Sequence, residues 1–339
     1  MNQDHKMKAV AAHVYAGGFS LGIGKHFNVV AHLENSDYGA ETVKANLDVE
    51  IQQSPWALDK YSDIDLVFGN PPCAPWSSLG VGKGEDDPRF QDTLSILNVA
   101  DILKPKFVVF ESVQNIMKRG RDVLNTLEER MLKCGYSVTH LLHNAQDFGI
   151  PQRRKRYFFV AHKVAFNPQA PKNNAVLIDD VLDSVEPGGY DLIRPCDEKI
   201  WNGRLNLVQP GQVMRKVNLP NERNKTAVGC YRLNGETVAR AFVGDYAIIH
   251  HKEDRPITVN EVKAICGFPQ DYNIIANSRQ KTLNQLAQGV MPPVATWLGN
   301  EIKKSIIDDI PTKETAVHTI DDNYEANQTC FNLNKQTNK

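Results

Sequence analysis

The stretch Asp65-Leu-Val-Phe-Gly-Asn-Pro-Pro-Cys-Ala-Pro-Trp-Ser77 carries an apolar run directly into a proline-rich turn. Residues 66–68 predict a short buried strand, and Gly69 permits the bend that follows it. Because proline fixes φ, the two prolines of the turn hold Cys73 rigidly at the carboxyl end of this strand. Open α/β sheets place their functional groups at that end of their strands. The stretch therefore predicts an α/β fold with Cys73 in its site.

Two more candidate strands bring chemically useful side chains to the same kind of position. Phe107-Val-Val-Phe110 leads into Glu111, and Tyr157-Phe-Phe-Val-Ala161 follows the basic run Gln152-Arg-Arg-Lys-Arg156. A lone cysteine beside a proline turn is more often structural than reactive. Here a thiol, a carboxyl and guanidinium groups can converge on one small planar substrate. This combination favours Cys73 as a nucleophile.

The motifs together carry a resemblance to a known family. Asn-Pro-Pro-Cys73, Glu111-Ser-Val and the basic run are followed by Arg255-Pro-Ile-Thr-Val-Asn-Glu-Val-Lys-Ala-Ile-Cys-Gly-Phe-Pro-Gln-Asp-Tyr272. In this order and spacing, over most of its length, the chain resembles the DNA cytosine-5 methyltransferases. The resemblance implies a large doubly wound, Rossmann-like methyltransferase domain with a mostly parallel sheet. It also implies a small, irregular, β-containing target-recognition domain, S-adenosyl-L-methionine as the methyl donor and double-stranded DNA as the partner.

The resemblance also implies roles for the catalytic residues. Cys73 would attack C6 of a cytosine that has been flipped out of the duplex, which makes C5 nucleophilic. Glu111 would protonate N3, a role that needs a raised pKa. Arg156 would bind the exocyclic oxygen, and Arg154 would support it or contact a neighbouring phosphate.

On the cofactor side, a first strand from Lys8 to Tyr15 runs into a glycine turn that opens a helix. Glu34 ends the next strand, where an acidic residue commonly accepts hydrogen bonds from ribose hydroxyls. By spacing alone a solvated loop carboxylate is equally compatible, and the resemblance favours the ribose role. The predicted cofactor-binding residues are Tyr15, Ala16, Gly17, Gly18, Phe19, Glu34, Glu50, Ile51, Asn70 and Pro72.

Three departures from the family pattern fall on the cofactor side. The glycine loop is two residues short, Ser112 replaces an asparagine, and Gln288-Gly-Val-Met291 stands where Gly-Asn is expected. They leave open a C5 transferase with another one-carbon donor, a modified sulfonium or a methylene-folate. A catalytically silent DNA-binding relative is a further alternative, against which the intact Cys73 and Glu111 argue. The residues do not decide between DNA and RNA.

The order of segments predicts a large catalytic and cofactor domain at 1–163, a target-recognition domain at 164–255, a return to the large domain at 256–310 and a polar, disordered tail at 311–339. Residues 77–89 resemble the family's mobile loop, which closes over the target base. The recognition segment is expected to present a cationic surface through Arg204, Arg215, Lys216, Arg223, Lys225, Arg232 and Arg240.

Composition sets only loose bounds on function. The formal net charge of −1 does not by itself mark a nucleic-acid binder. Six scattered cysteines without a Cys-x-x-Cys pair predict neither a zinc site nor a disulfide framework. No apolar run approaches the roughly 20 residues that span a bilayer, so we expect a cytoplasmic protein with no membrane contact. We also expect a monomer and no bound metal.

Overall fold

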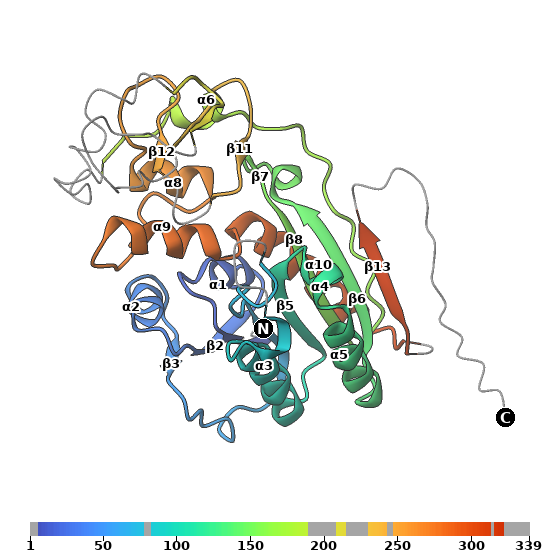
Figure 1. The fold of residues 1–339 in the computed structure, drawn as a ribbon. Coiled ribbons are helices and arrows are strands. Elements are labelled where there is room, and N and C mark those ends of the chain that lie inside the picture. Colours follow the sequence, from blue (N-terminus) through green and yellow to red (C-terminus); the bar gives the residue numbers. More distant parts are fainter. Residues whose placement is uncertain are drawn as a thin grey trace, which may run out of the picture.

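The computed structural model describes residues 6–77, 83–188, 208–214, 230–242, 247–312 and 315–321. Its centre is an eight-stranded sheet (Figure 1). From one edge to the other, the strands are β13 (Val317–Asp321), β6 (Ser137–Asn144), β8 (Lys155–His162), β5 (Phe107–Val113), β4 (Ile64–Gly69), β1 (Lys8–Ala12), β2 (Asn28–Leu33) and β3 (Glu50–Gln52).

All neighbouring strands of this sheet are parallel except β8, which runs antiparallel between β5 and β6. Consequently β8 begins where β5 ends, and Arg156 lies opposite Val113 in the register. Two residues earlier on β5 is Glu111. The antiparallel strand therefore delivers the basic run to the carboxyl ends of the parallel strands.

Helices cover both faces of the sheet, as a doubly wound fold requires (Figure 1). One apolar core cluster includes side chains of α1 (Gly18–Ile23), α8 (Val259–Ile265), α9 (Arg279–Gln288) and α10 (Pro292–Asp308). The other includes side chains of α3 (Phe90–Leu103), α4 (Ile116–Arg119) and α5 (Arg121–Lys133). The remaining helical elements are α2 (Asp37–Asn46), α6 (Ile178–Leu182) and two short 3-10 turns, Gly84–Asp86 and Ala145–Phe148. The predicted fold class is confirmed.

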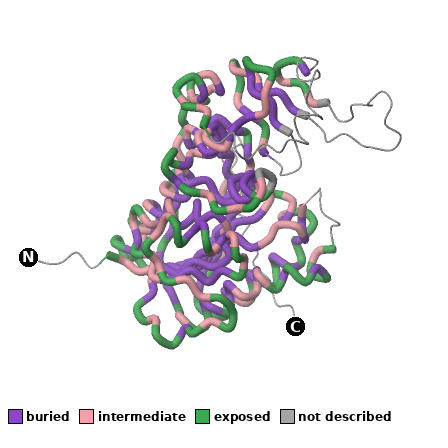
Figure 2. Tube along the Cα trace, turned by 90° about the vertical axis from the view of Figure 1, so that its left-hand side faces the viewer, coloured by how far each residue is buried: buried purple, intermediate pink, exposed green. Residues whose placement is uncertain are grey.

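A smaller lobe, formed by the described parts of residues 164–255, extends from the large one (Figure 2). It contains a three-stranded sheet of β12 (Ala247–Ile249), β10 (Cys230–Arg232) and β9 (Val213–Met214). A second small sheet pairs β11 (Ala239–Arg240) with β7 (Gln152–Arg153) of the basic run. Buried side chains of this small lobe belong to the same apolar cluster as α8 and α10. The domain boundaries stay predictions, because the core is continuous across them.

Two sequence expectations about the elements are wrong. The tail from 311 contains β13, which pairs in parallel with β6, because strand pairing uses backbone groups and does not require apolar side chains. The first strand ends at Ala12 instead of Tyr15, since His13 and Tyr15 have positive φ values of 56° and 49°.

The predicted cationic surface is mostly beyond reach of the structure. Arg204, Arg215, Lys216, Arg223 and Lys225 lie outside the described residues, as do positions 78–82 of the predicted mobile loop. Arg232 is buried, and its guanidinium donates to the carbonyls of Val208 and His250 and pairs with Asp254, so it is not a surface cation. Arg240 is exposed. No helix among the described residues is long and apolar enough to cross a membrane.

Candidate active site

Cys73 lies four residues past the end of β4, half-buried in a turn closed by backbone hydrogen bonds. The amides of Trp76 and Ser77 both donate to the Cys73 carbonyl, at 3.1 and 3.0 Å. Burial raises the pKa of the thiol, and the negative charge of Glu111 raises it further, whereas Arg156 and Arg154 lower it. The resting thiol is therefore neutral, and its ionisation depends on the charges brought close to it.

Glu111 lies on β5 with only 2% of its surface exposed. Its Oε1 is 2.9 Å from Nε of Arg156, and its Oε2 accepts a 2.5 Å hydrogen bond from the side-chain amide of Asn70. Burial raises the pKa of this carboxyl, against the lowering effect of Arg156 and Arg154. A carboxyl with a raised pKa is suited to give a proton to a bound base.

The two arginines of the basic run differ in their contacts. Arg156 keeps part of its side chain exposed beside Glu111. Arg154 is buried, and its guanidinium donates to the carbonyls of Ala287, Gln288 and Gly289, where α9 ends. Arg154 therefore fixes the chain between α9 and α10, and its predicted role, to support Arg156 or to contact a neighbouring phosphate, stays a prediction.

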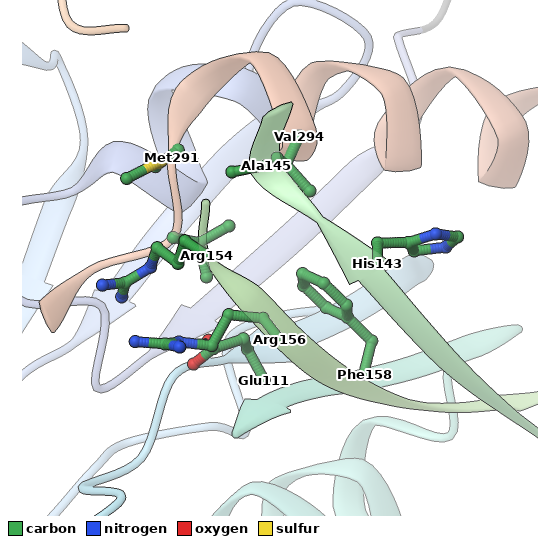
Figure 3. Close-up of a pocket in the computed structure, with 9 residues that line it drawn as sticks. Glu111, His143, Ala145, Arg154, Arg156, Phe158, Met291 and Val294 are labelled. Atoms are coloured by element: carbon green, nitrogen blue, oxygen red, sulfur yellow. The ribbon is translucent and has the colours of Figure 1, made fainter. Parts of the chain in front are cut away.

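A pocket opens beside these groups (Figure 3). Glu111, Arg154 and Arg156 form its polar wall. Its other lining residues are His143, Ala145, Phe158, Val290, Met291 and Val294. Cys73 does not line this pocket. The charges of Glu111, Arg154 and Arg156 nevertheless act on its thiol and shift its pKa.

The glycine turn after β1 is packed closely. Gly17 has φ 75°, and a Cβ there would lie 2.8 Å from Oη of Tyr272, which donates a 2.5 Å hydrogen bond to the Ala16 carbonyl. A Cβ on Gly18 would lie 2.4 Å from the Val290 carbonyl. Only glycine fits at either position.

The side chain of Phe19, next to the glycine turn, packs in the core. Its side chain is fully buried, with edge-on ring contacts to Phe68 at 4.8 Å and to Phe158 at 6.3 Å. The side chain therefore leaves no face for a ligand, and the prediction that Phe19 contacts the cofactor stays a prediction that only its backbone can fulfil.

Glu34 ends β2 with 3% of its surface exposed. Its carboxylate accepts hydrogen bonds from the amides of Tyr15 at 3.2 Å and Ser36 at 2.9 Å, and burial raises its pKa. Burial raises the pKa of Tyr15 as well, with contributions from Cys73 and Glu34. Tyr15 thus lies between the cysteine turn and the acid.

The other predicted cofactor residues are less well placed. Glu50 is exposed, and its carboxylate already pairs with Lys60 and the Tyr61 hydroxyl. Ile51 and Pro72 are partly buried. The structure therefore brings Tyr15 next to Glu34, whereas the carboxylate of Glu50 is already paired.

A family model for C-5 cytosine-specific DNA methylases matches residues 10–304. The chain belongs to this family. Among curated proteins it is 26% identical to the type II methyltransferase M.AplI of Arthrospira platensis, over 90% of this chain and 89% of that protein. It is 27% identical to M.MthTI of Methanothermobacter thermautotrophicus, over 86% and 95%.

Two solved structures show the same fold as this methylase. A putative DNA modification methyltransferase from an E. coli prophage superposes with a TM-score of 0.68 at 18% identity, over 89% of this chain and 99% of that one. The S. pombe Dnmt2 methyltransferase superposes with a TM-score of 0.61 at 14% identity, over 88% and 99%.

The family uses S-adenosyl-L-methionine, and the residues of this methylase fit that donor. Buried Glu34 carries a carboxylate without a cationic partner among the described residues, an acceptor suited to the two ribose hydroxyls. The glycine turn brings backbone close to a ligand at the carboxyl ends of β1 and β4. Tyr272 and the Val290 carbonyl pack directly against the shortened turn and hold its backbone in place.

Two roles in this methylase were missed by sequence reasoning. Tyr272 secures the glycine turn from 256 residues away in the chain. Val290 and Met291 line the pocket, and the Pro292-Pro293 pair that starts α10 was the available signal for a fixed backbone there.

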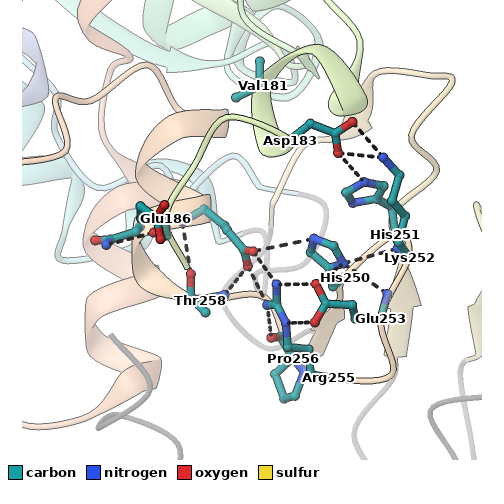
Figure 4. Close-up of polar contacts among 12 residues, drawn as sticks. Val181, Asp183, Glu186, His250, His251, Lys252, Glu253, Arg255, Pro256 and Thr258 are labelled. Carbon is teal, nitrogen blue, oxygen red and sulfur yellow. Dashed lines mark hydrogen bonds and ion pairs between the residues drawn. The ribbon is translucent and has the colours of Figure 1, made fainter. Parts of the chain in front are cut away.

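The small lobe is joined to α8 by an ion-pair network (Figure 4). Arg255 makes two hydrogen bonds to the buried carboxylate of Glu261, at 2.7 and 2.9 Å, and two more to the exposed Glu253. Glu261 also accepts from the Thr258 amide at 2.8 Å, which completes the N-terminal capping box of α8. This network fixes the orientation of the segment that leads from the small lobe back to the large one.

The same region contains a cluster of possible metal ligands. One ligand atom each from Asp179, Asp183 and His251 lies within 4.8 Å of the others. Nζ of Lys252 is 2.6 Å from Asp183 and 3.3 Å from Asp179, so both carboxylates already have a cationic partner. The cluster is an ion-pair network.

Proposed function

We propose that the chain transfers a methyl group to C5 of a cytosine flipped out of double-stranded DNA. The observation that carries the proposal is the placement of Glu111 between Arg156 and Asn70, within charge-interaction range of Cys73. These groups supply a nucleophile, an acid and a cation for one pyrimidine ring. Membership of the C-5 cytosine-specific DNA methylase family supports both the reaction and the substrate.

Cys73 begins the reaction. Its thiol loses a proton to solvent, and the resulting thiolate adds to C6 of the base. The positive charge of Arg156 stabilises the thiolate, as its lowering effect on the Cys73 pKa indicates. Because the negative charge of Glu111 raises the pKa of the buried thiol, ionisation is favoured while that carboxyl carries its proton.

Glu111 gives its proton to N3 as the sulfur attacks, so the ring becomes a neutral enamine with a nucleophilic C5. Its raised pKa makes this transfer accessible near neutral pH. Arg156 now holds Oε1 of Glu111. We propose that Arg156 shifts to the exocyclic O2 when the base enters, which frees Oε1 for N3.

S-adenosyl-L-methionine, when bound, supplies the electrophilic methyl group. Glu34 orients it by accepting from the ribose hydroxyls, and the glycine turn brings backbone amides near it. After transfer, C5 loses its proton to solvent, Cys73 leaves as a thiolate and Glu111 recovers the N3 proton. Aromaticity of the ring is then restored.

Two measurements test this function. Mass spectrometry of nucleosides from DNA treated with the protein and S-adenosyl-L-methionine is expected to show 5-methylcytosine. Duplexes containing 5-fluorocytosine are expected to trap a covalent complex, and Cys73→Ala is expected to abolish it. Adduct formation by Cys73→Ala would refute the assigned nucleophile, and absence of 5-methylcytosine would refute the reaction.

Two further proposals concern the kind of nucleic acid that is the substrate and the number of copies of the chain that act on it. We propose that duplex DNA is preferred over single strands and tRNA, and that one copy of the chain acts alone. Competition between these nucleic acids, together with sedimentation of the complex, tests both. A preference for tRNA, or a two-to-one complex, would contradict them.

A further inference from the structure

Asn70 occupies an unusual position at the end of β4. Its side chain is 2% exposed, and its Nδ2 donates to Oε2 of Glu111 at 2.5 Å. The amide NH2 of Asn70 is therefore the group that faces Glu111. The amide oxygen of Asn70 therefore points elsewhere, and it is buried without a hydrogen-bond partner.

An unpartnered acceptor in a buried site costs about 1–3 kcal/mol. The backbone of Asn70 is held rigidly, since its backbone N–H donates to the Ala12 carbonyl at 3.3 Å and two prolines follow it in the sequence. The acceptor therefore cannot turn toward another partner without breaking the contact to Glu111. A ligand that brings a donor to this oxygen recovers the cost.

The three polar groups stand in a fixed order: the guanidinium of Arg156 on Oε1 of Glu111, then Glu111 itself, then the amide of Asn70 on Oε2. The Watson–Crick edge of cytosine presents O2, N3 and the 4-amino group in the same order, as acceptor, acceptor and donor. The protein offers a guanidinium donor, a carboxyl donor and an amide acceptor. The two sequences of groups are complementary at all three positions.

We propose that Asn70 is a specificity-determining residue, whose amide oxygen accepts a hydrogen bond from the 4-amino group of the flipped cytosine while its NH2 orients Glu111. The proposal rests on the proposed function and adds the means by which the base is identified. Uracil and thymine carry a carbonyl oxygen at position 4 and a proton on N3. They would place an acceptor against the Asn70 oxygen and a donor against the proton of Glu111.

The size of the effect follows from the unpaired acceptor. A base that lacks the 4-amino group leaves the Asn70 oxygen unsatisfied, which corresponds to about a 5- to 150-fold loss in kcat/KM. Removing the amide abolishes this discrimination. It also removes a donor from the ionised form of Glu111, so the carboxyl holds its proton to higher pH.

The test uses duplexes in which the target is cytosine, its 4-deamino analogue 2-pyrimidinone, or uracil. For the unmodified protein, we expect kcat/KM for cytosine to exceed that for 2-pyrimidinone by at least the 5- to 150-fold given above. For Asn70→Ala, we expect this ratio to fall by the same factor, chiefly through slower reaction with cytosine. The alkaline limb of the pH profile, along which Glu111 loses its proton, should move to higher pH.

Two further variants keep the result interpretable. Asn70→Ser retains a small polar side chain and should show an intermediate ratio if Asn70→Ala folds poorly. Gln152→Ala removes another buried amide whose oxygen is unpartnered and whose nitrogen contacts Cys266 instead of Glu111. That control should leave the base preference unchanged.

The possible failures are distinguishable. An unchanged base ratio in Asn70→Ala overturns the assignment of Asn70, even if methylation of cytosine proceeds normally. A raised KM for S-adenosyl-L-methionine with an unchanged base ratio would place Asn70 on the donor side and also overturn it. Failure of the unmodified protein to methylate any of the duplexes would instead refute the proposed function, and this inference with it.

Discussion

Replacement of Glu111 by glutamine is expected to change two measurable properties of the protein in opposite directions. The substitution keeps the size of the side chain but removes its acid and its negative charge. In the structure this carboxyl is contacted by Arg156 at 2.9 Å and by Asn70 at 2.5 Å, and it raises the pKa of Cys73. The reaction loses its proton donor, whereas Cys73 loses a nearby negative charge that disfavours the thiolate.

The catalytic loss is estimated from general acid catalysis, which contributes about 10²- to 10⁴-fold. We expect methyl transfer by Glu111→Gln to slow within that range. The thiol should respond the other way, because removing the charge of Glu111 lowers the Cys73 pKa. Each unit of lowering raises the thiolate fraction about tenfold and reduces its intrinsic nucleophilicity by about threefold. Alkylation of Cys73 should then be about threefold faster for each unit.

The assay combines single-turnover methylation with iodoacetamide labelling at neutral pH, each site being followed by peptide mass spectrometry. Cys134 is exposed and serves as the internal reference for reagent concentration. Slower labelling of Cys73 in Glu111→Gln, or methylation within twofold of the unmodified protein, would refute the reasoning that the two groups face each other in one site.

Four further predictions concern stability and cofactor binding. Glu261→Ala breaks the buried pair with Arg255 and the α8 capping box, so urea denaturation should show that the free energy of unfolding falls by about 3 kcal/mol. The control Glu253→Ala removes the exposed partner of Arg255 and should lower it by under about 1 kcal/mol. Equal losses would contradict the role of burial. Glu34→Gln should weaken S-adenosyl-L-methionine binding about 10- to 100-fold by calorimetry, and binding to the unmodified protein should weaken as pH falls through the raised pKa of Glu34. Phe19→Ala should lower stability by about 3–5 kcal/mol while leaving the donor affinity of the folded fraction unchanged; a selective loss of affinity would restore its cofactor role. Burial lowers the pKa of His32 to about 3, so only the unfolded chain takes up a proton between about pH 6.5 and 3, and stability decreases as the pH falls through that window. At pH 5, His32→Leu should remove about 2 kcal/mol of this acid destabilisation. An unchanged pH dependence of stability would contradict the role given to His32.

The local signals in the sequence were sufficient for much of the framework. The strands predicted at residues 66–68 and 107–110 lie within β4 and β5, because apolar patterning acts over a few residues. Cys73 and Glu111 could be recognised as partners, since both follow core strands whose carboxyl ends meet at one edge of a parallel sheet.

Other features depend on residues that are far apart in the chain. Arg154 and Arg156 look alike in the sequence, yet one holds the end of α9 and the other faces Glu111. Phe19 sits in a glycine turn, yet the packing of Phe68 and Phe158 places it in the core. The polar segment of β13 gave no strand signal, because its partner β6 is 179 positions away in the register.

The sequence by itself determined the class of fold and indicated the candidate nucleophile and acid, because rigid turns and strand ends are properties of short segments. Only the tertiary structure decided which polar atoms are left without partners. The amide oxygen of Asn70 is such an atom, and its state depends on Glu111, 41 residues away, whose carboxylate takes up the other end of the same amide. Hydrogen-bond satisfaction in a buried site is a property of the assembled fold, and in this protein it indicates how the base is identified.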